Sequence, residues 1–217
     1  MKIDQLRSAL IPLGMIIRGG FHPLEDDGAL LDTQTLFMIG NAGPEMWRAF
    51  SKRNVTIPNP LDVWTRESLT PIAKAVDAHV VFPFDGPPFY PFQHWATQAD
   101  DVFPSPIGPL IHPVFGLWHA YRAAFLFEEK IDVPSRASII SPCATCADRA
   151  CLHTCPVHAF TPENYDVSGC RSFIAAPEGA DCLHAGCRAR RACPVGQDYI
   201  YSPDQAEFHM QSFLKAK

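Results

Sequence analysis

The chain has 217 residues, of which 47% are hydrophobic and 19% charged, which is enough apolar material for one large domain or a medium one with a small appendage. Its formal net charge of −5 argues against a dedicated nucleic-acid-binding protein. No run approaches the ~20 apolar residues that a membrane-spanning helix requires. Asp4 and Arg7 interrupt the apolar stretch at the N-terminus, so no signal peptide and no membrane partner are expected and a cytoplasmic location is predicted.

The first 140 residues have the pattern of mixed α and β structure. A short N-terminal helix is expected, with Ile3, Leu6 and Leu10 on one face. Buried strands are then predicted over residues 13–21 and 34–41. They are followed by a helix over 43–53 and by a helical region over 59–78 that Pro71 kinks or restarts. A strand from residue 79 runs into an aromatic and proline-rich loop, residues 115–127 favour a strand, and 133–142 read as a linker.

The cysteines are confined to the C-terminal part of the chain. Residues 1–142 contain none, whereas eight follow within a short stretch: Cys143, Cys146, Cys151, Cys155, Cys170, Cys182, Cys187 and Cys193. A disulfide framework would staple the whole chain, and disulfides are rare in the cytoplasm. The distribution therefore predicts a metal site.

The run "CATCADRACLHTCP" (143–156) resembles the bacterial ferredoxin motif C-x2-C-x2-C-x3-C-P, and "CLHAGCRARRACP" (182–194) also ends in Cys-Pro. Four thiolates at the corners of a tetrahedron are what a [4Fe-4S] cluster requires. In two-cluster ferredoxins the fourth cysteine of a run binds the other cluster. The resemblance thus implies one cluster on Cys143, Cys146, Cys151 and Cys193, and a second on Cys155, Cys170, Cys182 and Cys187.

Two features of this segment leave alternatives open. Zinc accepts the same ligands, although zinc ribbons usually show paired C-x2-C knuckles. The nearby arginines either stabilise an anionic cluster or form a solvated helix face: Arg149, Arg171, Arg188, Arg190 and Arg191.

The stretch "IHPVFGLWHAYR" (111–122) resembles the motif I-H-P-x-F-G-x-W-x-x-x-R of the CblC-type cobalamin-processing proteins. The resemblance covers roughly residues 5–134 and implies a nitroreductase- or flavin-reductase-like fold. In that family the arginine after the tryptophan helps bind the thiol cosubstrate near the corrin, and Arg122 occupies the matching position. The pattern alone favours the alternative that Arg122 pairs with a core carboxylate or extends its charged end to solvent.

The whole layout is similar to the epoxyqueuosine reductases and the corrinoid reductive dehalogenases, which place a related cobalamin-binding domain before a two-cluster ferredoxin module. The resemblance implies an α+β protein with a nitroreductase-like, cobalamin-binding domain over residues 1–140. A small, mainly helical and loop, bis-[4Fe-4S] ferredoxin-like domain would follow over 141–217. We find no match to the catalytic acid segment or helical-repeat extension of the epoxyqueuosine reductases, so no nucleic-acid partner is expected.

The function predicted from these resemblances is electron transfer from two [4Fe-4S] clusters to a cobalamin. The alternatives are a flavin-linked reductase that binds FMN, and a plain electron carrier whose N-terminal domain docks a partner. An electron donor such as a ferredoxin or flavodoxin reductase system is expected as a partner, and the fold suggests a homodimer. The residues predicted to shape the cofactor pocket are Arg122, Trp118, His112, Phe84, Phe89 and Tyr90.

Overall fold

The computed structural model describes residues 2–29, 32–53, 57–136, 139–161 and 164–216. The chain divides into two compact units, each described by itself: the first comprises Met1–Asp101 and His119–Ser138, and the second Val102–Trp118 and Ile139–Lys217. None of the helices in the described ranges is long and apolar enough to cross a membrane.

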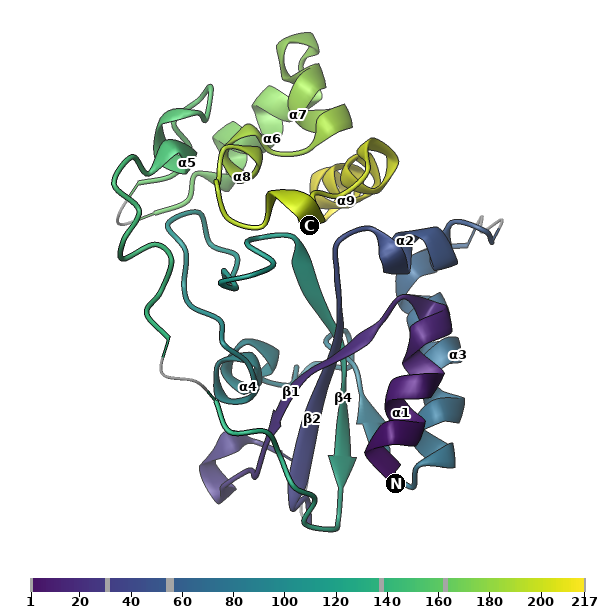
Figure 1. The fold of residues 1–217 in the computed structure, drawn as a ribbon. Helices are drawn as coiled ribbons and strands as arrows, with labels where there is room; N and C mark the ends of the chain where they lie inside the picture. Colours follow the sequence, from purple (N-terminus) through teal and green to yellow (C-terminus); the bar gives the residue numbers. More distant parts are fainter. Residues whose placement is uncertain (1, 30–31, 54–56, 137–138, 162–163, 217) are drawn as a thin grey trace. The chain divides into compact units, whose positions relative to one another are not determined.

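The first unit is built on a four-stranded antiparallel sheet of order β1-β2-β4-β3, so its α+β character agrees with the prediction. The strands are β1 (Ile16–Phe21), β2 (Thr35–Ala42), β3 (His79–Val81) and β4 (His119–Phe127). Consecutive residues of β2 are buried from Thr35 to Asn41, because both faces of the sheet are covered. Figure 1 shows α1 (Lys2–Leu10) and α3 (Pro60–Ala75) along one side of the sheet, and α4 (Phe92–Ala99) on the other.

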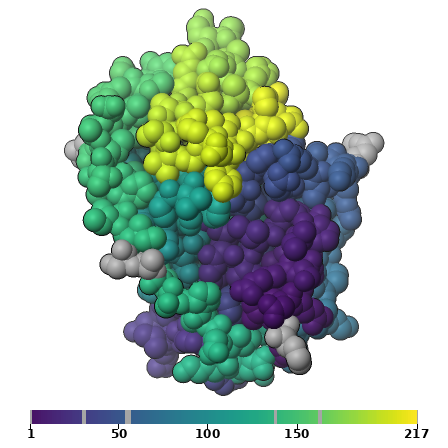
Figure 2. Space-filling view, in the orientation of Figure 1, coloured from purple at the N-terminus to yellow at the C-terminus, as the bar shows by residue number. Residues whose placement is uncertain are grey.

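The helices of this unit follow their apolar residues. Leu6 and Leu10 of α1 are buried, whereas its outer face lies at the surface in Figure 2. The short helix α2 (Glu45–Phe50) buries Trp47 and Phe50, and Phe50 packs edge-on against Trp64 of α3 with ring centroids 5.6 Å apart. Helix α3 runs through Pro71 without a break, although the sequence suggested a kink or restart there.

Two further expectations for residues 79–127 differ from the structure. The region expected to be an aromatic loop contains helix α4, which buries Trp95. The strand expected over residues 115–127 begins only at His119. Residues 112–116 instead form a tight turn closed by two hydrogen bonds between the main chains of His112 and Gly116, both 2.9 Å long.

The second unit is mainly helix and loop. Its helices are α5 (Ala150–His153), α6 (Val167–Ala175), α7 (Ala180–Ala185), α8 (Arg188–Arg191) and α9 (Pro203–Lys215). Within the described part of this unit, β pairing is confined to isolated bridges such as Phe160 with Tyr165. Its apolar core joins Ile107, Ile111 and Leu117 to Cys155, Ala159, Ala189 and Cys193. Residues 102–118 therefore pack with the cysteine-rich segment, although the predicted N-terminal domain, residues 1–140, included them.

Candidate metal centre

One group of four cysteines surrounds a small apolar cavity in the second unit. The cavity has a volume of about 30 Å³ and is lined by Cys143, Cys146, Cys151 and Cys193, together with Pro106, Ile111, Pro142, Arg149, Ala150, Pro194 and Val195. The first three cysteines come from one short run, and Cys193 comes from the segment after α8. The fold thus brings together the set that the ferredoxin spacing implied for one cluster.

Burial and mutual proximity set the chemistry of these thiols. Burial raises the pKa of Cys143, and the neighbouring Cys193 and Cys151 raise it further. Burial likewise raises the pKa of Cys151, with additional contributions from Cys193 and Cys146. Because these thiols disfavour one another's ionisation, several of them become thiolates together only where a cationic centre stabilises the combined negative charge.

The other four cysteines interact with one another in the same manner. Burial raises the pKa of Cys170, and Cys155 and Cys182 contribute to the rise. Burial also raises the pKa of Cys187, again with contributions from Cys182 and Cys170. The local structure explains how they are presented: Cys170 lies in α6, Cys182 in α7, and Cys187 at the residue that precedes α8.

Backbone N–H groups point at several of these sulfur atoms. The Ala159 N–H donates to Cys155 Sγ at 3.4 Å. The N–H groups of Arg190 and Ala189, in the first turn of α8, lower the pKa of Cys187 and so oppose the effect of its burial. Such donors favour the thiolate form, which is the form that binds iron or zinc.

The segment 102–118 approaches the loop after Cys193 at two glycines. Gly116 has φ +58°, and a Cβ there would lie 2.0 Å from the Val195 carbonyl oxygen. Gly196 has φ +76°, and a Cβ there would lie 2.3 Å from the Phe115 carbonyl carbon. This main-chain contact leaves no space for side chains, and Ile111 of the same segment lines the cavity together with the cysteines.

The arginines near the cysteines have separate partners. Arg188 and Arg191 both pair with Asp181, the former through Nε at 2.6 Å. Arg190 donates to the Leu117 carbonyl oxygen, with 3.2 Å from its Nε, and lies over the rings of Trp118 and Tyr201. Arg149 alone of the group lines the cavity of Cys143. Arg171 lies 5.0 Å from the ring centroid of Phe213.

The six residues predicted to shape a cofactor pocket are divided between the units. His112 and Trp118 belong to the second unit, and Arg122, Phe84, Phe89 and Tyr90 to the first. His112 Nδ1 accepts the N–H groups of Val114 and Phe115 at 3.0 and 3.1 Å, so it shapes its own turn. Trp118 is buried beside Tyr201, with ring centroids 5.4 Å apart.

In the first unit, Arg122 Nε donates to Asn41 Oδ1 at 3.2 Å. Phe84 stacks on Phe82, with ring centroids 5.2 Å apart. Tyr90 packs on Trp95 at 5.6 Å between ring centroids, and Phe89 is 64% exposed. Five of the six residues, all except Phe89, are thus engaged in polar or ring contacts that position the protein's own segments.

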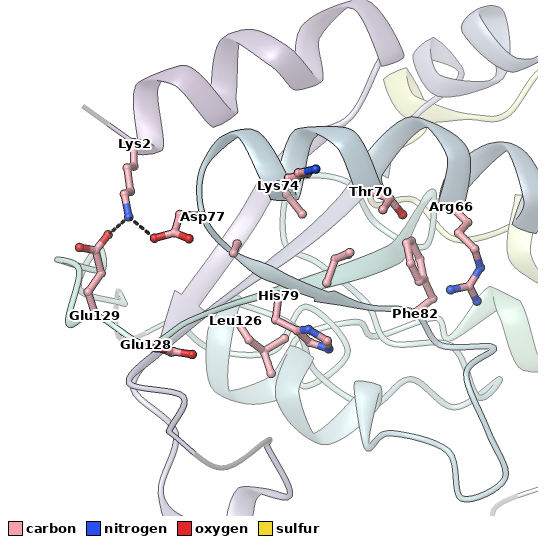
Figure 3. Close-up of a pocket in the computed structure, with 13 residues that line it drawn as sticks. Lys2, Arg66, Thr70, Lys74, Asp77, His79, Phe82, Leu126, Glu128 and Glu129 are labelled. Carbon is pink, nitrogen blue, oxygen red and sulfur yellow. Dashed lines mark ion pairs between the residues drawn. The ribbon is translucent and has the colours of Figure 1, made fainter.

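A larger cavity of about 790 Å³ lies beside α3 and β3 (Figure 3), and its lining contains none of the six predicted residues. At one end Lys2 Nζ pairs with Glu129 at 2.8 Å and with Asp77 at 3.5 Å. At the other end Arg66 lies 4.5 Å from the ring centroid of Phe82. The lining combines charges of both signs.

Three residues with evident roles were not singled out by the sequence: Asn41, Tyr165 and the buried Arg18. Asn41 lies in an apolar strand and accepts hydrogen bonds from Arg18 and Arg122. Tyr165 packs against the apolar cluster that contains Cys155 and Cys193. A polar residue inside an otherwise apolar strand is a signal that could have indicated Asn41. Within the described ranges, no group of three or more His, Cys, Asp or Glu side chains, the cysteines included, is arranged to hold a single metal ion.

Fold and site define an α+β protein with a cysteine-rich helical unit. No family model matches the chain, and no curated protein matches it. Among solved structures, it is similar to epoxyqueuosine reductase from Streptococcus thermophilus (TM-score 0.53, 14% identity, 95% of this chain and 70% of that chain). It is similar to the Bacillus subtilis enzyme with its catalytic loop swung out of the active site (0.54, 12%, 94% and 69%). A third is an epoxyqueuosine reductase with an epoxyqueuosine-modified tRNA-Tyr stem loop (0.55, 15%, 94% and 69%). At these identities the similarity concerns the fold.

Proposed function

We propose that the chain is an iron–sulfur redox protein whose second unit binds two [4Fe-4S] clusters. One cluster would be held by Cys143, Cys146, Cys151 and Cys193, and the other by Cys155, Cys170, Cys182 and Cys187. The observation that carries the proposal is the gathering of four thiols, one of them from a distant part of the sequence, around a single apolar cavity. When bound, such clusters supply one-electron transfer.

The donor set fits this group. All eight ligands are sulfur, the preferred ligand of iron–sulfur clusters, and the shell that surrounds them is apolar. Ile107, Ile111 and Leu117 form one apolar cluster with Cys155 and Cys193, while the N–H groups near Cys155 and Cys187 favour the thiolate form. Zinc is the alternative metal that the same thiolates could bind.

For the first unit we propose a nitroreductase-like fold that binds a cobalamin as electron acceptor. This part rests on the likeness in fold to epoxyqueuosine reductases. It rests also on the motif at residues 111–122, of which residues 119–122 belong to the first unit. The six predicted pocket residues do not define such a ligand, because five of them contact other parts of the protein and Phe89 is 64% exposed. We therefore assign no chemical step to a corrinoid, and FMN or a docked partner remain the alternatives.

Metal and cofactor analysis of protein purified without oxygen tests both parts. The proposal predicts about eight iron atoms and eight acid-labile sulfides per chain, whereas zinc at about two per chain would overturn it. Titration with cobalamin should shift the corrinoid absorption bands. No binding would remove the corrinoid part, and a flavin released on denaturation would favour the FMN alternative. The predicted electron donor, homodimer and cytoplasmic location stay proposals that accompany this function.

A further inference from the structure

The short helix α8 divides its three arginines between two directions. Arg188 and Arg191 are three residues apart, so they lie on one side of this single helical turn. Arg190 points elsewhere: its Nε donates to the Leu117 carbonyl oxygen at 3.2 Å, and its guanidinium lies 4.5 Å from the ring centroid of Trp118. Arg190 therefore holds segments of the second unit together, whereas Arg188 and Arg191 form a separate pair.

Asp181 of helix α7 fixes this pair. Arg188 Nε lies 2.6 Å from Asp181 Oδ2, and Arg191 Nη2 pairs with the same oxygen atom. Arg191 Nε also donates to the Gly186 carbonyl oxygen at 3.1 Å. The side chains of Arg188 and Arg191 are nevertheless 39% and 32% exposed, so both charges reach solvent. Two cations and one carboxylate leave a local charge of +1 on a chain whose net charge is −5.

The three charged side chains line a surface cavity of about 310 Å³, together with Thr154 and Ala192. Three of the lining residues are each next to a cysteine of one proposed cluster: Thr154 next to Cys155, Asp181 next to Cys182, and Arg188 next to Cys187. Ala192 directly precedes Cys193 of the other cluster. Cys155 and Cys182 themselves are only 7% and 5% exposed, so a molecule in the cavity touches their chain neighbours rather than their sulfur atoms.

We propose that this cavity is the docking site of an electron-donor protein that carries carboxylates around its redox group. The inference rests on the proposed iron–sulfur function and names the partner of the cluster on Cys155, Cys170, Cys182 and Cys187. Carboxylates of the donor pair with the exposed parts of the two guanidinium groups, and this complementarity speeds the encounter. One electron then passes from the reduced donor, which is oxidised, to the oxidised cluster, which is reduced, and no bond is formed or broken. A cavity of this size suits electron transfer, because such encounters use small interfaces.

The wild-type protein provides the first test. A reduced [2Fe-2S] ferredoxin with an acidic surface serves as the probe donor, and stopped-flow absorbance follows the reduction of the clusters. We expect the second-order rate constant to fall as the ionic strength rises from about 0.01 to about 0.15 M, because the Debye length shortens from about 30 to about 8 Å. Repulsion by the net charge of −5 alone would make the rate constant rise with salt, and that result would overturn the docking role.

Two substitutions at the cavity should change the rate constant in opposite directions. Arg188→Gln removes a cation and should lower it roughly threefold to tenfold at low ionic strength, whereas Asp181→Asn removes the carboxylate and should raise it by a similar factor. Damage to the local structure would slow both variants, because each loses the same ion pair. Slower reduction of both variants would therefore refute the proposal.

Arg53→Gln is the matched control, because Arg53 is also a partly exposed arginine, paired with Glu67 at 3.5 Å in the first unit. Its rate constant should stay at the wild-type value, and a loss equal to that of Arg188→Gln would make the effect one of total charge. Reduced methyl viologen, a small cationic donor, should not be slowed by Arg188→Gln. Equal slowing with both donors would show that the substitution acts on the cluster instead of on docking. Failure of the proposed function looks different, because the wild-type protein would then contain no iron and no acid-labile sulfide.

Discussion

Arg122 Nε donates a hydrogen bond to Oδ1 of the buried Asn41, 3.2 Å away. Arg18 Nη1 donates to the Asn41 carbonyl oxygen at 3.3 Å from the opposite neighbouring strand. Register irregularities occur at both arginines, between Ile17 and Gly19 on β1 and opposite Ile39 and Gly40 on β4. Such irregularities redirect side chains, and here they bring two guanidinium groups to one residue of β2.

The Asn41→Ala variant should therefore lose about 1–3 kcal/mol of unfolding free energy, because the Arg122 guanidinium loses its side-chain acceptor. The control is Asn41→Asp, which retains an acceptor oxygen next to both cations and should lose less. Urea unfolding followed by tryptophan fluorescence measures both. Equal losses in the two variants would contradict the role given to the acceptor.

A second buried polar contact joins Arg18 to Asp100, with 2.7 Å between Nη2 and Oδ2 and side-chain exposures of 1% and 7%. We predict that Asp100→Ala lowers the unfolding free energy by about 3–5 kcal/mol, because it leaves a buried guanidinium without its counter-charge. Asp101→Ala is the matched control. Its partner Arg136 is 38% exposed and 3.4 Å away, so its loss should cost less than about 1 kcal/mol in the same urea measurement. Similar costs for the two variants would refute the prediction.

Tyr121 makes stability sensitive to alkaline pH. Its hydroxyl donates to Asp100 at 2.8 Å, and burial, together with that carboxylate, raises the pKa of Tyr121 above the usual value despite the opposing charge of Arg18. The unfolded chain releases this proton near pH 10, whereas the folded chain retains it. The contribution of Tyr121 to the unfolding free energy is therefore fully present below pH 10. It is lost as the pH rises further, by about 1.4 kcal/mol for each pH unit.

Tyr121→Phe should reduce this slope above pH 10, even though the variant is less stable at every pH because Asp100 loses a donor. The measurement is the unfolding free energy in urea between pH 8 and 11. Since burial also raises the pKa of Tyr165, part of the slope should persist. An identical slope in the variant would show that Tyr121 ionises equally in both states.

The sheet was predictable where its residues follow simple rules. The apolar runs that predicted strands over 13–21 and 34–41 correspond to β1 (Ile16–Phe21) and β2 (Thr35–Ala42), because strands covered on both faces need continuous apolar sequence. The redirected Arg18 and Arg122 were not predictable, because a one-residue irregularity leaves no trace in such a run. Helix α4 was missed because its aromatic residues and the preceding Pro91 suggested a loop. Pro71 does not interrupt α3, since it lies on the exposed side and forfeits only one backbone hydrogen bond.

The sequence also predicted only part of the candidate metal centre. Clustering in the sequence identified the eight cysteines, since local spacing is what a short metal-binding loop requires. The packing of Ile111 against Cys143 is a long-range contact and is encoded only indirectly, through the glycines at 116 and 196. The stacking of Tyr165 on Phe160 and Phe213 joins separate segments of the chain, and no periodicity in the sequence indicates it.

The Gly116→Ala variant should disrupt the second unit. A Cβ at Gly116 would lie 2.0 Å from the Val195 carbonyl oxygen, so segment 102–118 could not approach the loop that carries Cys193. Gly108→Ala is the matched control, because Gly108 also has a positive φ, +99°, but has open space around its added Cβ. We expect both to lose about 1–2 kcal/mol from strain, and Gly116→Ala to lose more and to bind less metal. Equal metal content and stability in the two variants would contradict the steric argument.

The last prediction concerns the proposed division of the eight cysteines into two groups of four, one for each cluster. Cys193→Ser and Cys146→Ser remove ligands from the same cavity, so both should abolish the same cluster spectrum and lower iron from about eight to about four atoms per chain. Cys155→Ser and Cys182→Ser should abolish the other spectrum, because those thiols both interact with Cys170. Iron analysis and EPR of the reduced variants provide the measurement. If Cys193→Ser removed the spectrum that Cys182→Ser removes, Cys193 would belong to the second group. The cavity it shares with Cys143 would then have to be formed without a common cluster.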